Sequence, residues 1–383
     1  MEVSELKNKI DALFPCIWKD DFKVDISDIF DKYIDIVNSC IDLDDTILSN
    51  IKTFCNQLIE IVDLYYDGRR GVAFELFTSI MNGCEECNGL FESIGKIDVT
   101  KDDFFYRARV KDEGNSFGIL DMFHIPLNKR GLVKTQRYSS PGFPCLYLGN
   151  SLYSCWEELR RTSFESLVFS AYRARRSFGL FDMRIPYMED YQNEKLNQTL
   201  KRIPLVIACS IAVKHQDDAF KPEYIIPQFL TELIIINNKS ILHNKMLADS
   251  PSVIWGIIYS STHIHEDFTY GRKYMENIIL PVVETSAKEN YCHYLASLFD
   301  ISQPSCYEIL KENILHLESC GEEDEYEYEY ESSAMGIMEN KLKSSDFKEL
   351  PHIYVPSVVI KLDWRGEQPV KVPIYSNVDW EIE

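Results

Sequence analysis

Three short segments, far apart in the sequence, combine residue types that can bind an anion and do chemistry beside it. They are FFYRAR at 104–109, RYSSPGFPCLYLGNSLYSCWEELRR at 137–161, and WGIIYSS at 255–261 with ENIILP at 276–281. Their arginines stand in a chain with 40 basic and 61 acidic residues and a net charge of −21. Arginine binds anions through planar, bidentate hydrogen bonds. The pattern therefore favours a compact anionic ligand in a locally basic pocket.

The middle segment predicts a strand, a sharp turn and a helix that carries a carboxylate. CLYL reads as a strand in which Tyr147 faces away from its two leucine neighbours. Gly149 allows a sharp turn, and Ser151 is a good N-cap for the next helix. Glu158 then lies about two turns in, on a partly apolar face, whereas Glu157 is expected to face solvent. Because a buried carboxylate is costly unless it is paired or used, Glu158 is the candidate reactive group.

Each candidate residue, taken singly, also fits a structural role. Arg107 could pair with an acid, Tyr147 could be a core aromatic residue, and Ser261 could cap the loop after its strand. Glu158 could lie on a solvated helix face with Arg161 as its i+3 ion-pair partner. The combination of the segments is more specific than any single piece.

The combined pattern resembles the RES domain, a family named for Arg, Glu and Ser residues. The resemblance covers about residues 100–285, with a return at 352–375. The family elements YRA, G-x-P-x-L-Y-x-A, G-I-x-Y-x-S and N-x-x-L correspond to 106–108, 142–149, 256–261 and 277–280. The family glutamate corresponds to Glu158, eleven residues after Tyr147.

The chain departs from the compact family members in three ways. The connection is lengthened by an insertion at 111–136, and Gly149 stands where alanine is commoner. N- and C-terminal extensions flank the resembling region, as in larger RES proteins with a HEPN-like N-terminal domain. Ser357, in a YVPS context, is the alternative to Ser261 as the family serine.

The resemblance implies an α+β fold like that of ADP-ribosyltransferases, with a mixed or antiparallel sheet, and an enzyme that consumes NAD. The nicotinamide–ribose bond would be cleaved by a glycohydrolase or phosphorylase acting as a bacterial toxin or defence effector. The implied catalytic residues are Arg107 for the pyrophosphate, Tyr147 for stacking, Glu158 beside the ribose and Ser261 for orientation. The implied NAD-binding residues are Tyr106, Arg107, Arg137, Tyr147, Tyr259 and Asn277.

Other functions remain open at this point. One is a protein ADP-ribosyltransferase, and another is a non-catalytic module that binds a nucleotide or a partner. HEPN ribonucleases place a catalytic arginine a few residues before a histidine, but no Arg here has a His four to seven positions later. The resemblance leaves open an Xre-like antitoxin or another regulatory partner, and a homodimer.

Several common signatures are absent from the sequence. GxGxxG, GxxxxGK[ST], HExxH and GxSxG do not occur. Cys84 and Cys87 have CxxC spacing but supply two of the four ligands that a structural zinc needs, and the HIHED stretch at 263–267 reads as a polar turn. We therefore expect no metal.

The elements that must position these residues divide the chain in two. Residues 1–97 show helical periodicity and predict a helical domain, and 98–383 predict the RES domain. Asp44 or Asp45 is a plausible N-cap, and the segment from Pro222 reads as a helix. A helical extension is expected at 289–320, an acidic loop at 321–333, and final strands that return to the sheet. Candidate strands are 104–110, 144–148, 178–183, 203–213, 253–259, 277–283 and 353–362.

Charge and cysteine content limit the compartment and the partners. A net charge of −21 argues against a broad basic face for nucleic acid or for anionic membranes. Seven of the acids lie in EEDEYEYEYE at 322–331. Eleven scattered cysteines, an opening segment without an apolar core and no long apolar run predict a cytoplasmic protein with reduced thiols.

Overall fold

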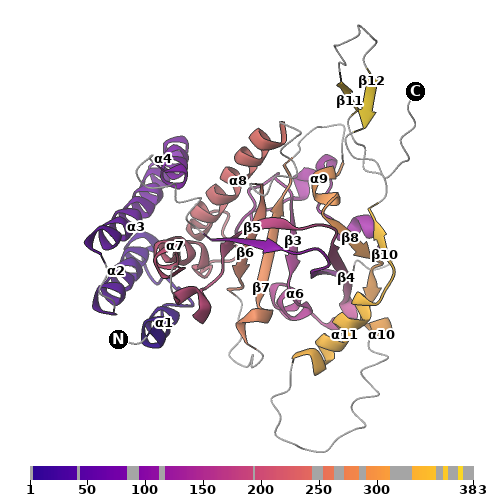
Figure 1. Ribbon diagram of the computed structural model, residues 1–383, viewed down its shortest axis with the longest axis horizontal. Helices are drawn as coiled ribbons and strands as arrows, with labels where there is room; N and C mark the ends of the chain where they lie inside the picture. Colours follow the sequence, from indigo (N-terminus) through magenta and orange to yellow (C-terminus); the bar gives the residue numbers. More distant parts are fainter. Residues whose placement is uncertain are drawn as a thin grey trace, which may run out of the picture.

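The sheet lies at the centre of the molecule, between the N-terminal helices on one side and short C-terminal elements on the other (Figure 1). The computed structural model describes residues 3–40, 44–83, 95–111, 117–192, 195–243, 253–262, 271–283, 290–310, 330–350, 357–360 and 370–373. None of the helices in these ranges has the length and apolar character needed to cross a membrane. The α+β class expected from the sequence is confirmed.

Ten described strands form the main sheet in the order β1-β5-β6-β7-β3-β2-β4-β8-β10, with β9 beside β4. The pair β5/β6 is parallel, and the other pairs are antiparallel. Their bounds are β1 (Lys96–Val99), β2 (Phe104–Val110), β3 (Cys145–Gly149), β4 (Leu167–Ala174), β5 (Phe178–Met183), β6 (Ile254–Ser260), β7 (Glu276–Pro281), β8 (Phe299–Ser302), β9 (Ser305–Cys306) and β10 (Phe347–Glu349).

The described residues of the N-terminal part contain four amphipathic helices, namely α1 (Val3–Asp11), α2 (Phe22–Cys40), α3 (Asp45–Tyr66) and α4 (Arg70–Asn82). Asp44 is the N-cap of α3, as expected, because its side chain accepts a hydrogen bond from the Thr46 amide at 2.7 Å. Their apolar faces share one core with α7 (Lys195–Ser210), α8 (Ile225–His243) and one face of the sheet. Tyr33, for example, donates to the Leu200 carbonyl at 2.6 Å. The helical region is thus packed into the same core as the sheet, and residue 97 lies within β1.

The insertion at 111–136 covers part of the opposite sheet face. Its described part contains the 3₁₀ helices η1 (Ile119–Met122) and η2 (Leu127–Leu132). Phe123 and Leu127 are buried in a second core with residues such as Trp255. His124 accepts a hydrogen bond at Nε2 from the Cys292 amide, and burial lowers the pKa of its ring to about 4. A neutral, buried histidine therefore ties the insertion to the backbone of Cys292, which lies outside the strands.

The strand expected at 203–213 is wrong, since residues up to Ser210 belong to α7. Every residue from Arg202 to Ser210 is buried, so the sequence shows a continuous apolar run and not the one-sided pattern of a surface helix. A short apolar run cannot distinguish a buried strand from a buried helix by periodicity. The helix packs between the N-terminal helices and the sheet, which explains its apolar character on all sides.

The C-terminal third also differs from expectation. The described part of 289–320 contains the short helices α9 (His293–Ala296) and α10 (Tyr307–Leu310), with β8 and β9 between them, and not one helical extension. Residues 321–329 of the expected acidic loop lie outside the described residues, and η9 (Tyr330–Ser332) follows. After α11 (Ala334–Lys343), β11 (Ser357–Ile360) and β12 (Val370–Pro373) pair with each other as a separate two-stranded sheet, so the expected return to the main sheet is wrong.

Gly256 on β6 marks a close approach that a side chain would prevent. A Cβ at this position would lie 1.9 Å from the Ile279 carbonyl oxygen on β7. We predict that Gly256→Ala lowers the free energy of unfolding by about 1–3 kcal/mol in urea titrations.

The matched control is Gly71→Ala in α4, where no atom lies within 4 Å of the added methyl group. Alanine favours helices, so this change should leave the free energy of unfolding equal or raise it by up to about 1 kcal/mol. Equal stabilities of the two variants would contradict the close packing of β6 against β7.

Candidate functional site

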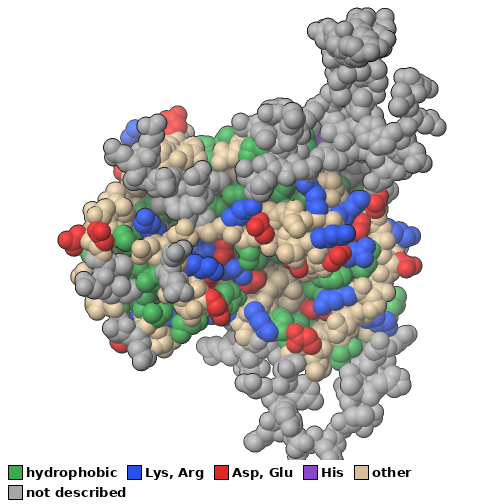
Figure 2. All heavy atoms as spheres, in the orientation of Figure 1, with side chains coloured by type: hydrophobic (Ala, Val, Ile, Leu, Met, Phe, Trp, Pro, Cys, Tyr) green, Lys and Arg blue, Asp and Glu red, His purple; other side chains and the backbone are tan. Residues whose placement is uncertain are grey.

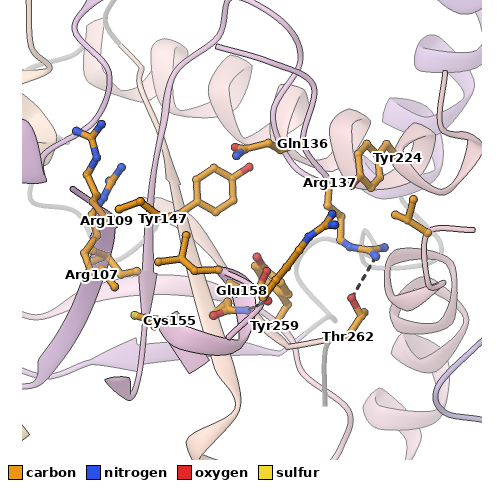
Figure 3. A pocket seen from close by; sticks show the side chains of 18 residues that line it. Arg107, Arg109, Gln136, Arg137, Tyr147, Cys155, Glu158, Tyr224, Tyr259 and Thr262 are labelled. Atoms are coloured by element: carbon orange, nitrogen blue, oxygen red, sulfur yellow. Dashed lines mark hydrogen bonds between the residues drawn. The ribbon is translucent and has the colours of Figure 1, made fainter. Parts of the chain in front are cut away.

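A cavity of about 560 Å³ opens where strands β2 and β3 separate. In the described sheet the two strands share one register pair, Tyr106 with Gly149, whereas β2 pairs with β4 over its whole length. Beyond that pair, 107–110 of β2 and 147–149 of β3 line the two sides of the cavity. Figure 3 shows Arg107 and Arg109 on one side, Arg137 and Tyr224 on the other, and Tyr147 and Glu158 between them.

The carboxylate of Glu158 is held in this cavity by two side chains from distant segments. Ser151 caps α6 (Leu152–Glu158) as predicted, accepting a hydrogen bond from the Ser154 amide at 2.9 Å. Glu158 is the last residue of this helix and is exposed to the cavity. Its Oε1 accepts hydrogen bonds from Ser261 Oγ at 2.8 Å and from Asn277 Nδ2 at 2.5 Å. Within the described ranges, no hydrogen bond to Glu158 uses Oε2, which leaves this oxygen as the candidate contact for a ligand.

The orientations expected for Glu157 and Glu158 are reversed. Glu157 was expected to face solvent, but it is 6% exposed and pairs with Arg161 at 2.6 Å. Arg160 and Arg161 adopt positive φ values of 57° and 54°, which turn the chain back at the end of the helix. This turn brings Arg161 to Glu157 and not to its predicted partner Glu158. Glu158 is therefore not engaged in a helix-surface ion pair with Arg161.

The turn between β3 and α6 is fixed by close contacts. At Gly149, a Cβ would lie 2.2 Å from Ser154 Oγ, which gives a physical reason for glycine where the RES family commonly has alanine. Asn150 donates to the Glu276 carboxylate at 3.1 Å, and its Oδ1 accepts from the Glu276 amide, also at 3.1 Å. These contacts join the start of α6 to β7, which carries Asn277.

Arg107 carries an unsatisfied donor beside the cavity. Its Nη1 is buried and has no hydrogen-bond partner among the described residues. Burial lowers the pKa of its guanidinium group. Neighbouring Arg109 is engaged by the Asp121 carbonyl and lies over the Phe117 ring at 5.2 Å. A buried donor without an acceptor is costly, so an anionic ligand would satisfy Arg107.

Arg137 lies on the opposite side and also has a structural role. Its Nη1 donates to the carbonyls of Cys209 and Ile211 at 3.0 and 2.8 Å, at the end of α7. Its Nη2 donates to Thr262 Oγ1 at 3.3 Å. The guanidinium group also lies 5.6 Å from the ring centre of Tyr224. Arg137 therefore adds positive charge to the cavity from a fixed position.

Two tyrosines form a neutral wall of the cavity. The Tyr147 hydroxyl lies 2.7 Å from Ser139 Oγ, and the Tyr259 ring packs against Tyr138 at 4.7 Å. Burial raises the pKa of both cavity tyrosines well above 10, and for Tyr259 the Glu158 charge adds to this effect. Both hydroxyls are therefore uncharged at neutral pH.

The structure gathers most of the residues singled out from the sequence. Arg107, Arg137, Tyr147, Glu158, Tyr259 and Asn277 line the cavity, and Ser261 contacts Glu158. Tyr106 instead packs beside Leu152 and lines a second cavity of about 240 Å³. Ser357 begins β11 in the separate two-stranded sheet.

Sequence reasoning missed further cavity residues, namely Gln136, Arg160, Val213, Tyr224 and Thr262. Arg160 lies inside the segment 137–161 but was not singled out, and the other four lie in or within a few residues of an expected element, where residue type alone gave no signal. The CxxC pair at 84–87 and the stretch 263–267 lie outside the described residues. Within the described ranges, no cluster of three or more His, Cys, Asp or Glu side chains could hold a metal ion.

Comparison with known proteins finds one similarity in sequence. The chain is 32% identical over 310 residues to a Bacillus subtilis (strain 168) protein named "Putative toxin YopC". The two chains are homologous. The match spans 76% of this chain and 66% of the Bacillus protein, just under two thirds of its length. No family model and no solved structure matches the chain, so membership of the RES family stays a prediction.

The unsatisfied guanidinium group of Arg107 leads to a binding prediction. We expect inorganic pyrophosphate to raise the melting temperature of the protein, since an anion bound to the folded state stabilises it. Arg107→Met should abolish this shift, while its own free energy of unfolding stays within about 1 kcal/mol of the parent or rises, because Arg107 has no ion pair with any residue in the described ranges.

Arg173→Met is the matched control on the adjacent strand β4, where the arginine pairs with Asp300 at 3.0 Å. This variant should keep the response to pyrophosphate. An equal shift in Arg107→Met and in the parent protein would place the anion site elsewhere.

Proposed function

We propose that this chain is a toxin that consumes NAD by cleaving the bond between nicotinamide and ribose. The observation that carries the proposal is the Glu158 carboxylate, held by Ser261 and Asn277 in a cavity that also contains the unsatisfied Arg107. The toxin part of the proposal is supported by the name of the Bacillus homologue.

The cavity has the size and charge that a dinucleotide requires. Its volume of about 560 Å³ lies within the range of cofactor-sized ligand sites, about 300–1,000 Å³. Arg107 would bind the pyrophosphate, and Arg109, Arg137 and Arg160 add positive charge around the cavity. The neutral ring of Tyr147 offers a face for the nicotinamide. This assignment gives the unpaired Nη1 of Arg107 an acceptor.

Glu158 would act on the charge that develops during bond cleavage. When the C1′–N bond breaks, its electron pair leaves with nicotinamide, and the ribose becomes cationic at C1′. A carboxylate close to the ribose stabilises this state more than the ground state, which is the requirement for catalysis. The donors Ser261 and Asn277 hold Oε1 in place, so Oε2 can accept from a ribose hydroxyl without reorganisation.

A nucleophile completes the reaction by forming a new bond to C1′. Attack by water releases one proton and gives ADP-ribose, whereas attack by phosphate gives a phosphorylated ADP-ribose. Attack by a protein side chain would give an ADP-ribosylated target. The three acceptors yield products of different mass, so they can be distinguished directly.

The two adjacent glutamates provide a matched test of this function. We predict that Glu158→Gln lowers kcat/KM for NAD at least about 100-fold, because the amide cannot stabilise the cationic ribose. Glu157→Gln should retain most of the activity, since Glu157 contacts Tyr153 and Arg161 and does not line the cavity. NAD and its products are measured by mass spectrometry with and without phosphate, and with cell extract.

Intact NAD in every condition would overturn the proposal. Equal activity of Glu158→Gln and the parent protein would remove Glu158 from the chemistry. Growth arrest on expression, relieved by Glu158→Gln and retained by Glu157→Gln, would connect NAD consumption to toxicity.

A further inference from the structure

The helix that carries Glu158 begins on a side-chain cap supplied by the C-terminal part of the chain. The Leu152 amide donates to Glu339 Oε1 at 2.6 Å, and the Tyr153 amide donates to the Tyr330 hydroxyl at 3.4 Å. The next amide, of Ser154, is satisfied by the N-cap Ser151. Each of the first three amides of α6 thus has a side-chain acceptor. Two of these acceptors come from residues about 180 positions further along the chain.

The two distant acceptors form one rigid unit. Tyr330 on η9 donates its hydroxyl proton to Glu339 Oε1 at 2.6 Å, and Glu339 lies on α11. Ser333 caps α11, with its Oγ 3.2 Å from the Gly336 amide. A Cβ on Gly336 would lie 2.3 Å from the Tyr330 carbonyl oxygen, so the glycine permits the close approach of α11 to η9. The contacts hold Glu339 and Tyr330 in fixed relative positions.

We propose that Glu339 is a positioning residue for the reaction centre: its carboxylate anchors the first turn of α6 and so sets where Glu158, at the other end, lies in the cavity. The inference rests on the proposed function of Glu158. The helix has seven residues, which corresponds to about 10 Å, so little of its length can absorb a displaced start. Glu339 would act through α6 without touching the substrate.

Burial of the Glu339 carboxyl group lowers the stability of the folded protein as the group ionises. A role beyond stabilising the fold is therefore favoured. Glu339 is 6% exposed, and burial raises the pKa of its carboxyl group to about 7, from an ordinary value of 4.5. Between pH 4.5 and about 7, the folded protein therefore keeps a proton on Glu339 that the unfolded chain has lost. The free energy of unfolding falls as the pH rises across this range. The ionised form, however, accepts a charge-assisted hydrogen bond from the Leu152 amide at the positive end of α6.

Several titratable groups around Glu339 also have shifted pKa values. Among these groups, Glu339 is the one expected to titrate near neutral pH. The pKa values of Tyr106, Cys155 and Tyr330 are raised, that of Cys155 to about 12, and the pKa of Glu331 is lowered. The further charged groups are Lys343 on α11, which lowers the Glu339 pKa, and Asp102 and Asp103 beside the neighbouring cavity.

The test compares Glu339→Gln, Glu339→Leu and Tyr330→Phe in the full chain. The parent kcat for NAD should rise with pH through an ionisation near 7, and this step should be missing in Glu339→Gln, whose amide oxygen can still accept both hydrogen bonds. Glu339→Leu removes the acceptor and should lower kcat about tenfold, with KM changed by less than about twofold. The kcat of Tyr330→Phe should lie between those of Glu339→Gln and Glu339→Leu.

The control is Glu349→Leu on β10, because that glutamate is half-exposed and pairs with Arg175. It should leave kcat and the pH profile unchanged. A kcat in Glu339→Leu equal to that of the parent protein would overturn the positioning role, as would the same step near pH 7 in Glu339→Gln. The proposed function would still stand in either case if the parent protein turns over NAD.

Amide hydrogen exchange at 152–158 gives a readout that does not depend on turnover. Glu339→Leu should accelerate exchange in α6 at least about tenfold, whereas Glu339→Gln and Glu349→Leu should not. If the parent protein leaves NAD intact, the proposed function fails, and exchange alone decides whether Glu339 holds α6. Unchanged protection in Glu339→Leu would then refute the anchor.

Discussion

The two hydrogen bonds that Glu158 Oε1 accepts from Ser261 and Asn277 are the contacts on which the arrangement of the site depends. They join the end of α6 to the segment after β6 and to the second residue of β7, which are more than 100 residues away in sequence. Asn277 lies on β7, which is paired with a strand on each side, and Ser261 directly follows the neighbouring strand β6. The carboxylate is therefore held by residues of, and directly after, two inner strands of the sheet.

The separation of β2 from β3 converts this arrangement into a cavity. A fully paired sheet would fill the space with neighbouring backbone, but β2 and β3 share one register pair, and 107–110 of β2 and 147–149 of β3 line the opening between them. The cavity is basic although the chain carries a net charge of −21. On the face drawn in Figure 2, basic and acidic side chains are interspersed over the described surface. Local placement of arginines, and not overall charge, thus sets the character of the site.

A buried ionic network contacts β7, the strand that carries Asn277. Asp182 pairs with Arg202 at 2.6 Å and with Arg184 at 2.9 Å, and Arg184 also pairs with Glu276 at 3.1 Å. Burial alone would raise the pKa of Asp182, but the two arginines outweigh it and lower the pKa. Glu276 precedes Asn277 on β7, so the network fixes the strand that presents a donor to Glu158. The shared core of α7, α8 and the N-terminal helices encloses the same region.

The sequence by itself determined the local features whose causes lie within a few residues. The N-caps Asp44 and Ser151, the strand around Tyr147 and the α+β class follow from side-chain type and spacing, because capping and alternation are short-range effects. Tertiary structure decided the rest. Burial on all sides hid the helical periodicity of 203–210 within α7, and the left-handed turn at 160–161 brought Arg161 to Glu157 and not to Glu158. The cap from Glu339, some 180 residues from Leu152, depends on contacts that no local pattern encodes.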